Sequence, residues 1–105
     1  MGTFSVSLRV GNLAGSTCVD IDALADAGSI HSYMPRDILE AVDVRPTETR
    51  SFCFADDRID ELPFGYARLI VDGLEVIAPV VFADRGAGPI LGATTLEAAH
   101  LMQIM

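Results

Sequence analysis

Apolar and polar side chains alternate along the first stretch of the chain. The apolar members of this pattern are Phe4, Val6, Leu8 and Val10. Alternation with a period of two is typical of a strand that buries one face. Gly11-Asn12 then supplies a turn, and a second alternating stretch predicts another strand from Ser16 to Leu24. We therefore expect the chain to begin with two strands joined by a turn.

The segment after the second strand allows two interpretations. Residues 24–27 (LADA) favour a helix by their intrinsic propensity. Gly28 and Ser29 follow immediately, however, and the alternation that precedes them belongs to a strand. We therefore expect the strand to end here in a turn.

Two short helices are predicted further along. Pro35 suits the first position of a helix over residues 36–42, because an N–H at that position has no acceptor within the helix. Arg45-Pro46 ends this helix. Thr94 and Glu97 have the spacing of a capping box, which predicts a second helix from Thr95 to Met102.

Two hairpins complete the pattern. Residues 50–54 look extended, residues 56–58 form a turn, and Ile59 begins the return strand. Asp72-Gly73 lies between the apolar runs 66–71 and 74–78, which is the signature of a two-residue hairpin. Together these elements predict one mainly β domain over residues 1–105. We expect a small closed or partly closed barrel with one or two short helices.

Charge narrows the class of partner. The chain has fifteen acidic residues and seven basic ones, all Arg, which gives a net charge of −8. Such a chain repels phosphate and anionic lipid, and its Arg residues are scattered along the sequence. We therefore predict neither nucleic acid nor a membrane surface as a partner.

The cellular compartment is predicted from two further features. The N-terminus lacks a basic stretch followed by an apolar one, and no apolar run approaches the length of a membrane span. Cys18 and Cys53 each lie in an apolar, strand-like stretch, which favours reduced, buried thiols over a disulfide between them. We expect a soluble protein of the cytoplasm.

Several familiar sites are excluded by spacing. The chain has neither a phosphate-binding Gly-x-x-x-x-Gly-Lys loop nor a dinucleotide-binding Gly-x-Gly-x-x-Gly motif. Asp20 and Asp22 lack the remaining residues of a calcium loop. Neither His31 nor His100 has a second possible ligand at the residue spacing of a metal site. No metal or organic cofactor is predicted.

One constellation retains chemical interest, the segment from Asp26 to Ser29 (sequence DAGS). Here an apolar strand delivers a carboxylate into a glycine turn, on a rigid support. An Asp before a glycine turn also occurs simply because its side chain caps the turn. From these residues alone, Asp26 is either a catalytic carboxylate or a cap of its turn, and both interpretations stay open.

Beyond this segment, the order of motifs resembles that of the retropepsin-like aspartic proteases, particularly the small bacterial single-domain members. In that family an apolar strand ends in Asp-Thr/Ser-Gly-Ala/Ser, and residues 26–29 occupy this place. A flap hairpin, two long strands, and two apolar residues followed by Gly and a short helix come next in the family. Residues 50–59, the Asp72-Gly73 hairpin, and the segment Ile90-Leu91-Gly92 stand in the same order.

The resemblance implies a fold, an activity and site residues. It implies an acid-protease-like β-barrel and an aspartic endopeptidase that acts on peptides or proteins as a homodimer. Asp26 would be the catalytic residue, facing its own copy. Gly28 and Ser29 would contact substrate beside it, and Asp56 and Asp57 would contact substrate from the tip of the flap.

Ala27 departs from the family pattern, which has Thr or Ser at this position with a hydroxyl that braces the two loops across the dimer axis. Ala cannot form that hydrogen bond. A second hypothesis is therefore a catalytically weak or inactive protease-like module that dimerises or binds peptides. A third is a structural β domain in which Asp26 only caps its turn.

Overall fold

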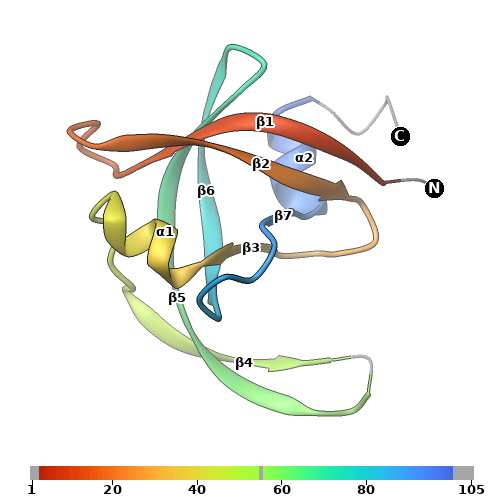
Figure 1. The fold of residues 1–105 in the computed structure, drawn as a ribbon. Coiled ribbons are helices and arrows are strands. Elements are labelled where there is room, and N and C mark those ends of the chain that lie inside the picture. The colour runs from red at the N-terminus through yellow and green to blue at the C-terminus, as the bar shows by residue number, and fades with distance from the viewer. Residues whose placement is uncertain (1–2, 55, 101–105) are drawn as a thin grey trace.

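The computed structural model describes residues 3–54 and 56–100. The strands of these residues are β1 (Thr3–Gly11), β2 (Cys18–Asp26), β3 (Ser32–Pro35), β4 (Glu48–Cys53), β5 (Ile59–Val71), β6 (Leu74–Ala83) and β7 (Ile90–Leu91). The helices are α1 (Arg36–Ala41) and α2 (Ala93–Ala98). The fold is mainly β with two short helices in this part of the chain, as the sequence predicts (Figure 1).

The described strands form one mixed sheet in the order β1-β2-β7-β3-β6-β5-β4. β1 pairs with β5 as well as with β2, from Leu8 opposite Val71 to Gly11 opposite Arg68, and this pairing joins the strands into a ring. β4 lies outside the ring. Together with the first half of β5 it forms the flap hairpin, which projects away from the rest of the molecule (Figure 1). The predicted closed architecture is present as this ring.

Two hydrophobic clusters hold the fold together. The main core fills the ring, and its most deeply buried members include Val10, Ala25, Met34, Leu39, Leu69, Leu91 and Leu96. The smaller cluster lies at the base of the flap hairpin and comprises Phe52, Phe64 and Val81, with Tyr33, Phe54 and Leu62 packed against it. The hydrophobic core is thus divided into one cluster inside the ring and a smaller one at the base of the flap hairpin.

The first two strands follow the period-two pattern of the sequence. β1 and β2 pair antiparallel over their whole length, from Thr3 opposite Asp26 to Gly11 opposite Cys18. β2 continues through residues 24–26 despite their helical propensity, because their backbone groups are paired with β1 and with β7. The prediction of a strand that ends in a turn is confirmed.

The hairpin at Asp72-Gly73 is also confirmed. β5 and β6 pair antiparallel up to Val71 opposite Leu74, and both turn residues have positive φ, 52° and 79°. Two positive φ values are what a two-residue turn needs in order to match the twist of its strands.

Pro35 precedes α1 as its N-cap residue, one position before its predicted place, and the helix ends at Ala41.

The second helix is present, but its predicted bounds and capping box are wrong, and so is the predicted burial of the two cysteines. α2 begins at Ala93 and ends at Ala98, and its N-cap is Gly92, with no side-chain cap among the described residues; residues 101–102 of the predicted helix lie outside them. The Thr94 hydroxyl donates to the Ile30 carbonyl oxygen, so it is not available for a capping box. Cys18 and Cys53 are free thiols as expected but exposed, because their positions on β2 and on the outermost strand β4 face away from both clusters.

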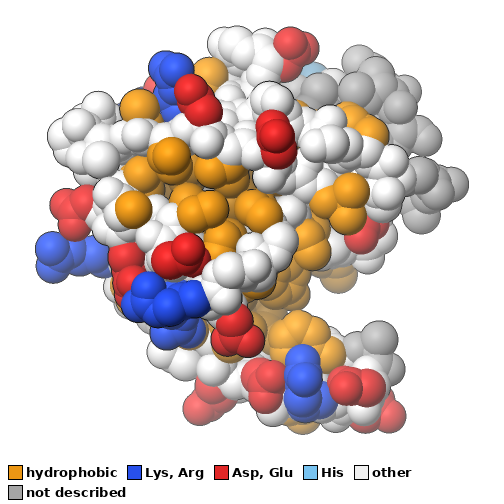
Figure 2. Space-filling model, viewed as in Figure 1, with side chains coloured by type: hydrophobic (Ala, Val, Ile, Leu, Met, Phe, Trp, Pro, Cys, Tyr) orange, Lys and Arg blue, Asp and Glu red, His pale blue; other side chains and the backbone are white. Residues whose placement is uncertain are grey.

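The surface of the molecule carries hydrophobic side chains on one broad face. Figure 2 shows them gathered between β2 and α1, and shows a notch between the flap hairpin and the rest of the molecule.

Both helices of the described residues are six residues long, and no helix there is long and apolar enough to cross a membrane.

Candidate active site

Asp26 is the last residue of β2, where the strand leaves the ring. Ala25 before it is completely buried, so the alternation of the strand turns Asp26 away from the core and leaves it half-buried. One carboxylate oxygen, Oδ1, accepts a hydrogen bond from the Gly28 backbone N–H at 2.9 Å. The carboxylate is therefore held in a fixed direction by its own turn.

The next two residues fit this turn for different reasons. Ala27 packs its methyl group against the main core. A side chain at Gly28 would bring its Cβ to 3.2 Å from Asp26 Oδ1, which would crowd the carboxylate. Gly28 thus keeps the surroundings of the carboxylate open, whereas Ala27 offers no hydroxyl to a neighbouring loop.

Ser29 closes the turn. Its backbone N–H donates to the Asp26 carbonyl oxygen at 3.1 Å, and its hydroxyl donates to the His31 carbonyl oxygen at 2.8 Å. The hydroxyl that we predicted as a substrate contact therefore has a partner within its own loop. Contact of Gly28 and Ser29 with substrate stays a prediction.

β7 supports the strand that carries Asp26. Leu24 and Ala25 pair in parallel with Ile90 and Leu91, and the Leu24 N–H donates to the Pro89 carbonyl oxygen at 3.0 Å. Ala25 and Leu91 are both completely buried. The floor beneath Asp26 is therefore built from two segments that lie far apart in the sequence.

The N-terminus of α2 holds the loop that follows the Asp26 turn. The Ala93 N–H donates to the Ser29 carbonyl oxygen at 2.6 Å, and the Thr94 N–H and hydroxyl both donate to the Ile30 carbonyl oxygen. The first N–H groups of a helix have no partner within the helix and bind such acceptors readily. In the sequence, the one signal for these contacts is the glycine before the helix.

A buried pair of hydroxyl groups, which the sequence did not predict, lies under the same loop. Ser32 and Thr95 are 2% and 1% exposed, and their oxygens are 2.6 Å apart. The Gly92 N–H donates to Ser32 Oγ at 2.9 Å. Single Ser and Thr residues in apolar segments carry no pattern that would have marked them in the sequence.

The flap carboxylates lie apart from this loop. Asp56 Oδ1 accepts from the Arg58 N–H at 3.1 Å, and Asp57 has a φ of 64° at the tip. Both residues are exposed, and among the described residues neither shares a hydrogen bond or an ion pair with residues 26–29. Figure 1 shows the flap turn and the loop after β2 on the same side of the molecule. A role of both residues in substrate binding stays a prediction.

Aromatic contacts connect the loop with the flap. The rings of His31 and Phe52 meet edge to face with their centroids 5.0 Å apart, and Phe52 stacks on Phe64 at 6.5 Å. Tyr33 packs against the same cluster, and burial raises the pKa of its hydroxyl above the usual value. The flap is therefore in contact with the strand that follows the Asp26 loop.

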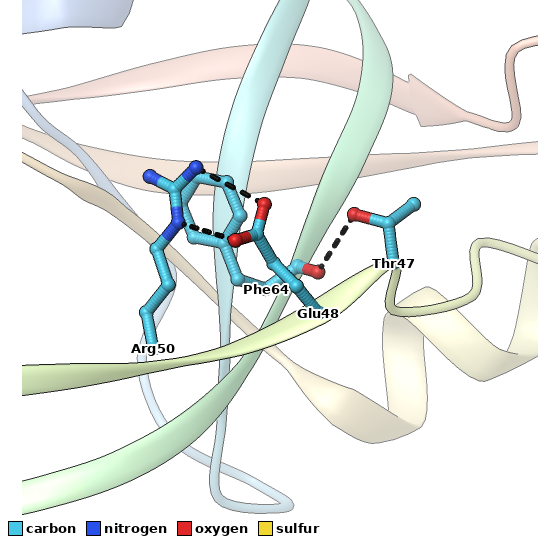
Figure 3. A network of polar contacts seen from close by, with 4 residues as sticks. All are labelled: Thr47, Glu48, Arg50 and Phe64. Carbon is cyan, nitrogen blue, oxygen red and sulfur yellow. Dashed lines mark hydrogen bonds and ion pairs between the residues drawn. The ribbon is translucent and has the colours of Figure 1, made fainter.

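The base of the flap is held by a charged contact that Figure 3 shows from close by. The Arg50 guanidinium lies 4.0 Å from the centre of the Phe64 ring and forms two hydrogen bonds of 3.0 Å with Glu48. Hydrogen bonding to Arg50 lowers the pKa of the Glu48 carboxyl. Thr47 donates to the Phe64 carbonyl oxygen from the same side.

In residues 3–54 and 56–100 no group of three or more His, Cys, Asp or Glu side chains is placed to hold a metal ion.

Comparison with known proteins identifies the fold. No protein-family model and no curated protein sequence matches the chain. Among solved structures, the chain is similar to the solution structure of the simian foamy virus (mac) protease, with a TM-score of 0.66 over 92% of this chain and 96% of that one. The fold is that of a retroviral protease. The two sequences are 18% identical, so this likeness concerns the retropepsin-like fold and confirms the fold class expected from the sequence.

Proposed function

We propose that this protein is an aspartic endopeptidase that acts as a homodimer, with Asp26 of each copy as the catalytic residue. The observation that carries the proposal is the position of Asp26. Its half-buried carboxylate is fixed by the Gly28 N–H at the end of a core strand, in a chain with the fold of a retroviral protease.

The chemistry requires two carboxylates. Two such groups brought face to face share one proton, because both cannot be ionised side by side. The ionised Asp26 takes a proton from a water molecule as the water attacks the peptide carbonyl. The protonated Asp26 of the other copy donates to the developing oxyanion, so no covalent intermediate forms.

Exposed apolar side chains support the need for a second copy. Leu24 and Ile30 flank the Asp26 turn and are 42% and 69% exposed. Large apolar side chains gathered beside a site are typical of a surface that another protein covers. A two-fold symmetric contact would cover both copies of this surface at once and bring the two carboxylates together.

The test is cleavage of an unstructured polypeptide, such as reduced casein, from acidic to neutral pH. We expect Asp26→Asn to lower the rate by about a thousandfold, since general acid-base groups contribute about 10²–10⁴ each. Asp72→Asn is the matched control, because it removes the same charge from another strand end, in the β5–β6 turn. Full activity of Asp26→Asn would contradict the aspartic mechanism.

Dimerisation is tested by the same assay at different protein concentrations. Activity per chain is expected to fall on dilution, because the site is complete only in the dimer. Ile30→Asp, which places a charge on the proposed contact, should shift this fall to higher concentration. Activity per chain that is independent of concentration, in a protein that sediments as a monomer, would contradict the homodimer.

Ala27 favours the second hypothesis, a module that binds peptides without cleaving them. Ala27 packs on the core and offers no hydroxyl across the proposed dimer axis. This hypothesis predicts that the unmodified protein binds casein peptides but leaves them intact, and that Ala27→Thr produces cleavage which Asp26→Asn abolishes.

A further inference from the structure

The loop that carries Asp26 is held by its own chain on three sides. The Ser29 and Ile30 carbonyl oxygens accept hydrogen bonds from the first residues of α2. The Ser29 N–H and hydroxyl are bound within the loop itself. These contacts hold the Ser29 N–H and the carbonyl oxygens of Ser29, Ile30 and His31, which restricts the freedom of the loop to change shape.

Gly92 brings the two segments into direct backbone contact. A Cβ atom at this position would lie 2.3 Å from the His31 carbonyl oxygen and 2.7 Å from that of Ser29. Only glycine permits so close an approach. The Gly92 N–H points to Ser32 Oγ, which lies directly after the loop.

Ser32 and Thr95 complete this arrangement from below. Their hydroxyl groups are hydrogen-bonded to one another in a site closed to water, and Ser32 also accepts from Gly92. Removing either hydroxyl would leave a buried polar group without its partner. The pair therefore specifies one relative position of β3, β7 and α2, the elements around the Asp26 loop.

We propose that Ser32 and Thr95 are positioning residues that brace the Asp26 loop within one chain, in the role that a hydroxyl at position 27 would otherwise fill between two chains. The inference rests on the proposed function for its kinetic consequence. The loop itself is braced whether or not the protein cleaves peptides.

The kinetic experiment compares single variants in the casein assay. Ser32→Ala and Thr95→Val are each expected to lower kcat about tenfold with KM unchanged within about twofold, because a small displacement of a catalytic group affects the chemical step more than binding. Thr95→Ser keeps the hydroxyl and should retain kcat within about threefold of the unmodified protein. Ser7→Ala is the matched control, since it removes an exposed hydrogen bond of 2.7 Å to Asp22 on the first two strands and should change neither constant.

Ala27→Thr tests the other half of the proposal. If the brace lies within the chain, restoring a hydroxyl at position 27 should change kcat by less than about threefold. A tenfold or larger gain in kcat would overturn the proposal, because it would show that the loop lacks a brace. Unchanged kcat in both Ser32→Ala and Thr95→Val would overturn it as well.

Amide hydrogen exchange provides a measurement that does not depend on activity. The Gly92 and Ala93 amides should exchange slowly in the unmodified protein. In Thr95→Val they should exchange at least about tenfold faster, while amides in the middle of β5 and β6 remain protected. If the protein cleaves nothing, the proposed function fails. The exchange rates of the Gly92 and Ala93 amides still test whether Ser32 and Thr95 brace the loop. Unchanged exchange at Gly92 and Ala93 in Thr95→Val would overturn the brace even in an active enzyme.

Discussion

Asp26 and Asp56 accept the same kind of hydrogen bond from their own turns, in two different surroundings. Each carboxylate accepts a hydrogen bond from the backbone N–H two residues later, at 2.9 Å for Asp26 and 3.1 Å for Asp56. Behind Asp26 lie β7, α2 and the main core. Asp56 sits at the exposed tip of the flap hairpin. The turn alone therefore does not mark a candidate catalytic residue; the support beneath it does.

The supports also differ in kind. The Asp26 loop is held by hydrogen bonds and by close backbone contact with a distant segment. The flap is held at its base by aromatic packing and by Arg50 over Phe64. Aromatic pairs occur over ring-centroid distances of about 4.5–7 Å, a wider range than that of hydrogen-bond lengths. We therefore expect the Asp26 loop to be the more rigid of the two segments.

The largest expected effect comes from exchanging the two carboxylates for amides. Asp26→Asn should abolish cleavage to about one part in a thousand. Asp56→Asn should raise KM about threefold and leave kcat unchanged, since an amide oxygen still accepts the bond from Arg58. Steady-state kinetics on a labelled peptide measures both. Comparable losses of kcat in the two variants would remove the distinction between the turns.

Gly92→Ala should break the support of the Asp26 loop. The added methyl group meets backbone atoms that cannot move aside, and overpacking of this kind costs about 3 kcal/mol of unfolding free energy. Urea unfolding followed by circular dichroism measures the loss. Gly88→Ala is the control, because nothing lies within 4 Å of a Cβ there, and it should change stability by less than about 0.5 kcal/mol. Equal stability of the two variants would contradict the close contact.

Phe52→Leu should loosen the flap and leave the Asp26 loop in place. Phe52 is 6% exposed and contacts both His31 and Phe64. The smaller side chain should cost about 1–2 kcal/mol of unfolding free energy. Amides of β4 should then exchange faster while those of Ser29 and Ala93 keep their rates, as measured by mass spectrometry. Faster exchange in both regions would mean that flap and loop move as one body.

The smallest effect concerns the charge at the base of the flap. Hydrogen bonding to Arg50 lowers the pKa of Glu48, so the stabilisation from this pair is present above the ordinary carboxyl pKa and is lost as the pH falls through the lowered value. Arg50→Gln should return the pKa of Glu48 toward its ordinary value. Carboxyl titration by NMR detects the change. An identical titration in both proteins would show that the pair does not form in solution.

The sequence predicted what depends on local pattern. Alternation placed β1 and β2, and Asp72-Gly73 placed the β5–β6 hairpin. It failed where distant segments decide the outcome. Thr94 has the spacing of a capping box, but its hydroxyl donates instead to the Ile30 carbonyl oxygen. That partner lies 64 residues away in the chain, so the local pattern gave no sign of it. Cys18 and Cys53 were expected to be buried because their segments are apolar. Cys18, however, shares a strand face with Asp20 and Asp22, and Cys53 lies on the face opposite Phe52.

The candidate site shows the same division. Asp26 and the glycine turn after it are visible in sequence because carboxylate and glycine act on adjacent residues. The buried pair of Ser32 and Thr95 is invisible, because its members come from β3 and α2 and each is an ordinary residue in its own segment. The residues that support a site can therefore be identified only from the three-dimensional structure, even where the reactive group can be identified from the sequence.

The pairing of β2 with β7 also has a consequence for the order of events during synthesis. Residues 24–32 are synthesised before residues 90–95, the segment that shapes them. Contacts so far apart in sequence form late in folding, since a long loop must close first. The growing chain can therefore assemble its first hairpin long before its candidate active site takes shape. Asp26 therefore takes up its position in the fold only after residues 90–95 have been made.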